Sequence, residues 1–182
     1  MNVITTDIES VKLIQPKVFS DDRGYFLETW NRKIFEDAGL DIHFVQDNES
    51  QSSKGTLRGI HFQLQHPQGK LVRAALGEVY DIAVDLRRDS PTFGHSVGAI
   101  LSAENKHQLW IPPGFGHAYY TMSDIAVFVY KCTDFYYPDD QYCLKWDDPA
   151  LDIRWPIEEG VETLLSEQDK NGKMLAELEG IL

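Results

Sequence analysis

One short segment of the chain, Thr56–Gln63, combines the pattern of a buried strand with residues that could do chemistry. Side chains alternate between the two faces of a strand, which predicts Arg58 and His61 on opposite faces. An imidazole titrates near neutral pH, so His61 is a candidate general base. A core histidine satisfied by hydrogen bonds explains the segment alone equally well.

Residues further along the chain supply the other groups that removal of a proton beside a ketone requires. Such a reaction needs a base beside the carbon and a positive group at the enolate oxygen. Lys70, at the start of the next apolar run, could supply the positive charge. Tyr130 could return a proton to the opposite face of the reacting carbon. Asp169 could hold the His61 imidazole in one tautomer.

Each of these residues also has an ordinary structural reading. Lys70 alone would be a surface lysine, and Tyr130 alone a packed tyrosine with a bonded hydroxyl. Asp169 lies in the C-terminal tail, where most carboxylates are solvated. His117 follows the glycine-rich stretch Pro112–Gly116, where it could contact a phosphate or simply stabilise a turn.

The sequence gives no compact support for a metal or nucleotide cofactor. Gln63 stands two residues after His61, and no glutamate follows closely enough to complete a His/Glu ligand cluster. Neither a Gly-x-Gly-x-x-Gly loop nor a Walker loop is present. The expected chemistry therefore uses neither a metal nor a cofactor.

Composition narrows the class of protein. The formal net charge of −12 over 182 residues argues against nucleic acid or an anionic membrane as a partner, but not against a small anionic ligand. No apolar stretch is long enough to span a membrane, and Met1–Asp7 lacks the features of a secretory signal. The two cysteines, Cys132 and Cys143, lack metal-type spacing. We therefore expect a reduced, cytoplasmic protein.

Short β-like runs separated by turn residues predict an all-β sandwich or barrel in one domain, residues 1–182. A short helix is expected at Arg32–Gly39 and a helical tail at Ser166–Leu182. The strand from Glu78 to Arg87 is apolar on one face, while the other carries Asp81 and Asp85. A cavity lined by such strands could bind a small ligand. The predicted strands are Val11–Phe19, Gly24–Trp30, Phe44–Ser50, Thr56–Gln63, Lys70–Leu76, Glu78–Arg87, Ser96–Ser102, Gln108–Ile111, Ala118–Met122 and Ala126–Cys132.

Several motifs, in order along nearly the whole chain, resemble the dTDP-4-dehydrorhamnose 3,5-epimerase family. Each motif is weak alone, but the ordered set is highly specific. The motifs are Asp22–Glu28, Gln46–Asn48, Leu57–Gln63, Gly69–Arg73, Val84–Arg87, Ser90–Gly94, Leu101–Asn105, Leu109–Pro112, Tyr130–Lys131 and Trp146–Pro149.

The resemblance implies a cupin-type jelly roll that epimerises C3 and C5 of a dTDP-4-keto-6-deoxyhexose without a cofactor. It implies that His61 is the base, that Asp169 is its partner and that Tyr130 is the acid on the other face. Lys70 would lie at the C4 oxygen. Further substrate contacts implied by the resemblance are Arg23, Glu28, Gln46, Asn48, Arg58, His117 and Tyr136.

The resemblance also implies a homodimer in which the N-terminal segment crosses to the partner. Arg23 and Glu28 would then serve the neighbouring subunit's pocket. The sequence departs from the common pattern at Gln141, where glutamate is frequent, and at Gln168, where lysine is frequent.

Three other functions stay open at this point. A relative could invert only one carbon or act on another nucleotide sugar. A 3,4-ketoisomerase is a second possibility, although the set of His61, Lys70 and Tyr130 argues against it. A cupin that merely binds a sugar is the non-enzymatic alternative.

Overall fold

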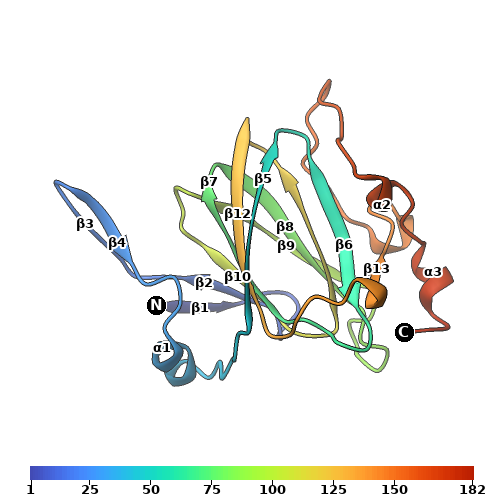
Figure 1. The fold of residues 1–182 in the computed structure, drawn as a ribbon, viewed down its shortest axis with the longest axis horizontal. Coiled ribbons are helices and arrows are strands. Elements are labelled where there is room, and N and C mark those ends of the chain that lie inside the picture. The colour runs from blue at the N-terminus through green and yellow to red at the C-terminus, as the bar shows by residue number, and fades with distance from the viewer.

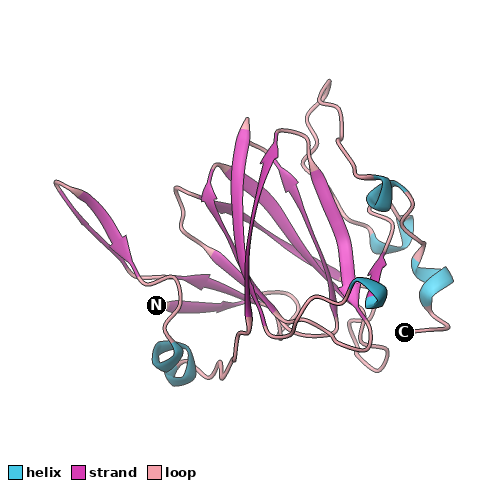
Figure 2. Ribbon diagram, in the orientation of Figure 1, coloured by secondary structure: helices cyan, strands magenta, loops and turns pink.

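The computed structural model describes residues 1–182, and most of its regular structure is strand (Figures 1 and 2). Eleven strands form two antiparallel sheets. The first sheet has the order β1 (Asn2–Thr5), β2 (Lys12–Gln15), β10 (Gln108–Ile111), β7 (Lys70–Leu76), β12 (Ile125–Cys132) and β5 (Gln46–Ser53). The second has the order β13 (Gln141–Cys143), β6 (Leu57–Gln63), β11 (Phe115–Thr121), β8 (Glu78–Asp85) and β9 (Ser96–Ser102).

The two sheets bury one apolar cluster between them. Alternating residues of both sheets supply it, among them Val72 and Phe128 from the first sheet and Val79 and Ala83 from the second. This packing confirms the predicted β sandwich, and it leaves polar side chains facing inward at one end.

Each sheet is also covered on its outer face. The C-terminal region packs Leu144, Leu151, Leu175 and Leu178 on the second sheet. The short helix α1 (Arg32–Asp37) buries Phe35 on the first sheet. α1 lies within the predicted range, and Gly39 follows it with φ +82°, as expected of a residue that ends a helix.

A two-stranded hairpin, β3 (Val18–Asp21) and β4 (Gly24–Leu27), projects away from both sheets (Figure 1). The sequence predicted one strand over Val11–Phe19, but the chain breaks at Pro16 into β2 and β3. Proline has no N–H to donate to a sheet and therefore interrupts the pairing.

The C-terminal tail is not the continuous helix that the sequence predicted. It forms two single turns, α2 (Glu167–Lys170) and α3 (Leu175–Leu178), and between them Lys173 makes a bridge to Leu144. Gly172 lies too close to the Leu144 carbonyl for any side chain. The tail therefore follows the sheet edge closely, while Leu175 and Leu178 are buried as their spacing predicted.

Six other predicted strands agree in position but differ at one or both ends, and β1 and β13 were not predicted. Two one-turn 3₁₀ helices, η1 (Pro138–Asp140) and η2 (Pro149–Leu151), complete the structure. None of its helices has the length and apolarity needed to cross a membrane.

Candidate active site

A cavity of about 500 Å³ opens between the two sheets. The second sheet contributes β6 and β11 to its walls, the first sheet contributes β5, β7 and β12, and the segment around α2 closes one side. Six of the predicted site residues line it, and these are Arg58, His61, Lys70, His117, Tyr130 and Asp169.

His61 and Asp169 form a close pair at this cavity. Nε2 of His61 lies 2.7 Å from Oδ1 of Asp169, although the ring N–H is poorly aligned with that oxygen. The carboxylate is fixed by two donors: the Gly59 amide donates to Oδ1 at 3.1 Å, and the Ser166 hydroxyl donates to Oδ2 at 2.6 Å. Burial opposes ionisation of Asp169, but His61 and Ser166 hold its pKa below the ordinary value.

Ser166 positions this carboxylate because it is the N-cap of α2. Its Oγ accepts a hydrogen bond from the Asp169 amide at 3.1 Å while its hydroxyl binds the Asp169 side chain. The tail residue Asp169 is only 2% exposed as a result. The structure therefore places the Asp169 carboxylate beside the His61 ring, as predicted.

The prediction that Arg58 and His61 lie on opposite faces is wrong, since both line the cavity. β6 has one extra residue between these two positions relative to its partner β11, where His61 faces His117 and Arg58 faces Tyr119. An extra residue of this kind shifts the alternation of side chains by one.

Gly59 makes this irregular segment of β6 possible. Its φ of +115° is unfavourable for other residues, and a Cβ here would lie 2.5 Å from the Ala118 Cβ. The backbone of β6 can therefore approach β11 only with glycine at this position.

A second histidine–carboxylate pair lies on the cavity floor. Nε2 of His117 is 2.8 Å from Oδ2 of Asp81, and both residues are buried. Burial raises the pKa of Asp81 and lowers the pKa of His117, so both shifts favour uncharged forms. His117 lies within β11, not on the glycine-rich turn that the sequence predicted.

Lys70, the first residue of β7, lines the cavity and has no ion-pair partner. Burial lowers the pKa of its ammonium group, and nearby Cys132 and Asp81 partly oppose that shift. An unpaired ammonium group at the wall of a cavity is available to stabilise a negative charge on a ligand.

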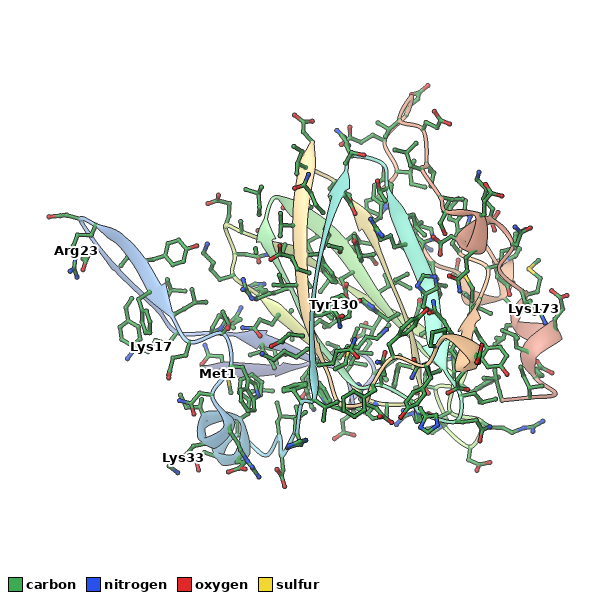
Figure 3. The ribbon with its side chains drawn as sticks, viewed as in Figure 1. Met1, Lys17, Arg23, Lys33, Tyr130 and Lys173 are labelled. Atoms are coloured by element: carbon green, nitrogen blue, oxygen red, sulfur yellow. The ribbon has the colours of Figure 1, made fainter.

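Tyr130 comes from β12 in the first sheet, whereas His61 comes from β6 in the second (Figure 3 labels Tyr130). The two groups therefore approach the cavity from opposite sheets. Phe128 lies on the same face of β12, with its ring centroid 6.0 Å from that of Tyr130, as alternation predicted. Burial raises the pKa of the Tyr130 phenol to about 12, which keeps it protonated at neutral pH.

Arg58 is held at the cavity by a polar row on the edge strand β5. Its Nε donates to Ser52 Oγ at 3.1 Å, and its guanidinium also reaches the Gln51 carbonyl at 3.3 Å. Tyr119 joins the row, with its hydroxyl 3.0 Å from Ser50 Oγ. The arrangement presents a positive group beside neutral hydroxyls, which suits an anionic ligand.

Gln46 and Asn48 use their side-chain amides inside the protein. Gln46 donates to the Asn48 side-chain oxygen at 2.9 Å and accepts from the Tyr136 amide at 3.0 Å. Asn48 donates in turn to Cys132 Sγ at 3.5 Å. Tyr136 lines a small adjoining cavity that also contains His61 and Tyr130. Gln46 therefore fixes the loop that carries Tyr136.

Arg23 and Glu28 do not reach the cavity of their own chain. Arg23 lies at the tip of the β3–β4 hairpin, far from Tyr130 (Figure 3), and pairs with Asp21 at 2.6 Å. Glu28 accepts a hydrogen bond from Asn31 beside α1.

Sequence reasoning missed four residues at or next to the site: Asp81, Tyr119 and Ser166, and also Cys143, whose Sγ lies 3.9 Å from Oδ1 of Asp169. Asp81 could have been found from the sequence, because it lies on the mixed face of a strand predicted to line a cavity. Ser166 also matched a helix N-cap. Tyr119 and Cys143 could not have been found from the sequence, since neither their spacing nor their neighbours distinguish them from core residues.

The two departures from the family pattern lie close together. Nε2 of Gln141 is 3.5 Å from Oε1 of Gln168, and the two residues line the adjoining cavity and the main cavity respectively. Two neutral side-chain amides therefore lie near His61, where the two cavities adjoin.

Comparison with known proteins gives consistent matches over nearly the whole chain. A family model described as dTDP-4-dehydrorhamnose 3,5-epimerase matches residues 5–177. A protein of that name from Pseudomonas aeruginosa is 54% identical over 171 residues, which cover 93% of each chain. The crystal structure of a 3,5-epimerase from Legionella pneumophila in complex with dTDP-4-keto-L-rhamnose has 48% identity and a TM-score of 0.95, covering 98% of this chain and 95% of that one. A 3'-monoepimerase from Streptomyces bikiniensis in complex with dTDP-quinovose has 33% identity and a TM-score of 0.89, covering 97% and 89%.

Proposed function

The chain belongs to the dTDP-4-dehydrorhamnose 3,5-epimerase family, and on that premise we propose the reaction and the residues that perform it. The reaction inverts C3 and C5 of dTDP-4-dehydro-6-deoxy-D-glucose and yields dTDP-4-dehydro-L-rhamnose for dTDP-L-rhamnose synthesis. The observation that carries the assignment of roles is the placement of His61 and Tyr130 on opposite sheets, with Lys70 at the same cavity.

His61 removes the proton from the carbon beside the ketone. Its Nε2 lies beside Asp169, so Nδ1 is the nitrogen left to accept the proton. The Asp169 carboxylate stabilises the imidazolium that forms.

Lys70 stabilises the enolate that forms at the C4 oxygen. The charge on that oxygen develops only along the reaction path, so the ammonium group stabilises the transition state more than the bound substrate. The same enolate oxygen serves both C3 and C5, because both carbons are adjacent to C4.

Tyr130 returns a proton from the opposite face of the ring, which completes the inversion. A phenol with a pKa of about 12 stays protonated at neutral pH and can donate. The proton on His61 then passes to solvent, and solvent restores the phenol.

Arg58 and His117 are proposed to contact the diphosphate and the sugar. The exposed guanidinium of Arg58 suits the diphosphate, and the buried His117 suits the sugar ring at the cavity floor. Gln46, Asn48 and Tyr136 would flank the nucleotide side.

We further propose a homodimer in which the β3–β4 hairpin inserts Arg23 and Glu28 beside the partner's cavity. The exposed apolar side chains of the hairpin support this proposal, since Phe26 is 65% and Tyr25 57% exposed in the single chain. Apolar surface of this kind is typical of protein interfaces. The free thiols of Cys132 and Cys143 favour a cytoplasmic location.

Proton NMR of the purified protein with dTDP-4-keto-6-deoxyglucose in D₂O, without added metal or cofactor, tests the reaction. We expect deuterium at both C3 and C5, and conversion of the product by a rhamnose-forming reductase. Label at one carbon would instead establish a single-centre epimerase, like the relative named a 3'-monoepimerase. Binding without any label would establish a sugar-binding protein.

A further inference from the structure

Three side chains that could bind a metal ion, one of them His61, lie close together at the edge of the cavity. The ligand atoms of His61, Cys143 and Asp169 all lie within 4.8 Å of one another. They come from three separate segments, because His61 and Cys143 are direct cross-strand partners in β6 and β13, and Asp169 lies in α2.

The donor set is the one that zinc prefers. Zn²⁺ binds imidazole nitrogen, thiolate sulfur and carboxylate oxygen, and a site with three protein ligands keeps one position for water. Softer cations of the same charge favour the thiolate and the imidazole as well.

Two further observations point to a ligand at this position. Nε2 of His61 is buried and has no well-aligned hydrogen-bond partner. Its neighbour Asp169, 2% exposed, is held by the Gly59 amide and the Ser166 hydroxyl. Hydrogen bonds of this kind orient a metal-binding carboxylate before the ion arrives.

We propose that His61, Cys143 and Asp169 form an inhibitory site for a thiophilic divalent cation such as Zn²⁺ or Cd²⁺. Binding replaces the thiol proton of Cys143, which leaves to solvent, and forms bonds from the ion to sulfur, Nε2 and Oδ1. No electron is transferred.

The expected consequence follows from the proposed function. An ion on Nε2 withdraws electron density from the imidazole, so Nδ1 becomes a poor proton acceptor. The ion also neutralises the carboxylate that would stabilise the imidazolium. Turnover should stop while the rest of the cavity stays open to the substrate.

Cobalt titration tests the site without substrate. Co²⁺ bound by a thiolate absorbs in the near ultraviolet, so the intact protein should develop this band in a one-to-one ratio. Cys143→Ala should abolish the band, whereas Cys132→Ala, which removes the other thiol, should keep it. A band that persists in Cys143→Ala, or no band in the intact protein, would overturn the site and leave the proposed reaction standing.

Zinc inhibition tests the consequence. Each variant's rate with zinc is divided by its own rate in a chelator, so differences in basal activity cancel. The intact enzyme should be inhibited reversibly. Cys143→Ala should require at least roughly 10–100-fold more zinc for the same inhibition, because loss of an outer-shell partner alone weakens metal binding by that much. Equal sensitivity of the two proteins would show that zinc acts elsewhere and would contradict the proposal.

Discussion

At the scale of residues, the protonation states of Asp169 and Tyr130 at neutral pH suit their proposed roles. Asp169 has a lowered pKa and is charged, so it can stabilise an imidazolium on His61. Tyr130 has a raised pKa and carries the proton that it must donate. Burial causes the shift of Tyr130, whereas His61 and Ser166 overcome burial at Asp169. The two facing sheets thus supply the proposed base, His61, and the proposed acid, Tyr130.

Lys70 should set the alkaline limit of turnover. Burial lowers its pKa from the ordinary 10.5, and only the protonated form stabilises an enolate. Activity should therefore fall as pH rises through a value below 10.5. Lys70→Gln should lower kcat by roughly 10²–10³-fold, leave dTDP affinity nearly unchanged and remove this alkaline limb from the residual activity. Rate profiles with pH, together with calorimetry of dTDP binding, check the two effects. An unchanged alkaline limb in the variant would assign the limb to another group.

At the scale of elements, β6 shows why the alternating pattern of a regular strand predicted the strand but not the face of every side chain. The pattern located β6 and its buried residues, but an extra residue placed Arg58 beside His61 on the cavity side. The permissive backbone of Gly59 was visible in the sequence as a glycine within a strand. The positive φ of Gly59 could not be predicted, because it depends on the close approach of β11, a strand distant in the chain.

Gly59→Ala should destabilise the fold and distort the site. The positive φ alone costs roughly 1–3 kcal/mol in an alanine, and the new Cβ would also contact Ala118 and the His117 carbonyl at 2.5 Å. Urea unfolding should show the loss. Gly180→Ala is the control, because a Cβ there has no neighbour within 4 Å and no positive φ. Equal stability of the two variants would contradict this account of β6.

The pairings around the cavity were predictable only in part. Alternation correctly grouped Phe128 with Tyr130, and the family resemblance correctly brought Asp169 to His61. Neither could reveal that Asp81 pairs with His117, because the two lie on neighbouring strands whose register no local pattern encodes. The tail broke into two turns because it follows the sheet edge, a tertiary constraint that outweighs helical spacing.

At the scale of the whole molecule, the hairpin β3–β4 stands apart from the two sheets (Figure 1). Its isolation leaves Arg23 without a role in its own chain's cavity. The proposed exchange between subunits would give it one. The expectation of a single domain stays a prediction, as does the dimer.

Subunit mixing should reveal whether Arg23 acts across the dimer. Arg23→Glu and His61→Ala chains, each inactive or strongly impaired alone, are mixed by refolding together. If Arg23 serves the partner's cavity, a mixed dimer has one intact site, and random pairing should restore about a quarter of full activity. If Arg23 acted within its own chain, every site would keep one lesion and mixing would restore nothing. His61→Ala mixed with Lys70→Gln is the control, because both lesions lie in the same cavity.

The central claim is that a base on one sheet and an acid on the other act on opposite faces of the substrate. Its most direct test measures, by NMR in D₂O, deuterium uptake and product formation in two single variants. His61→Ala should abolish deuterium uptake at C3 and C5 together, because it removes the base. Tyr130→Phe should retain uptake while epimerised product falls by roughly 10²–10⁴-fold, because it removes only the returning acid. Near-normal exchange in His61→Ala, or equal loss of exchange and product in Tyr130→Phe, would contradict the account.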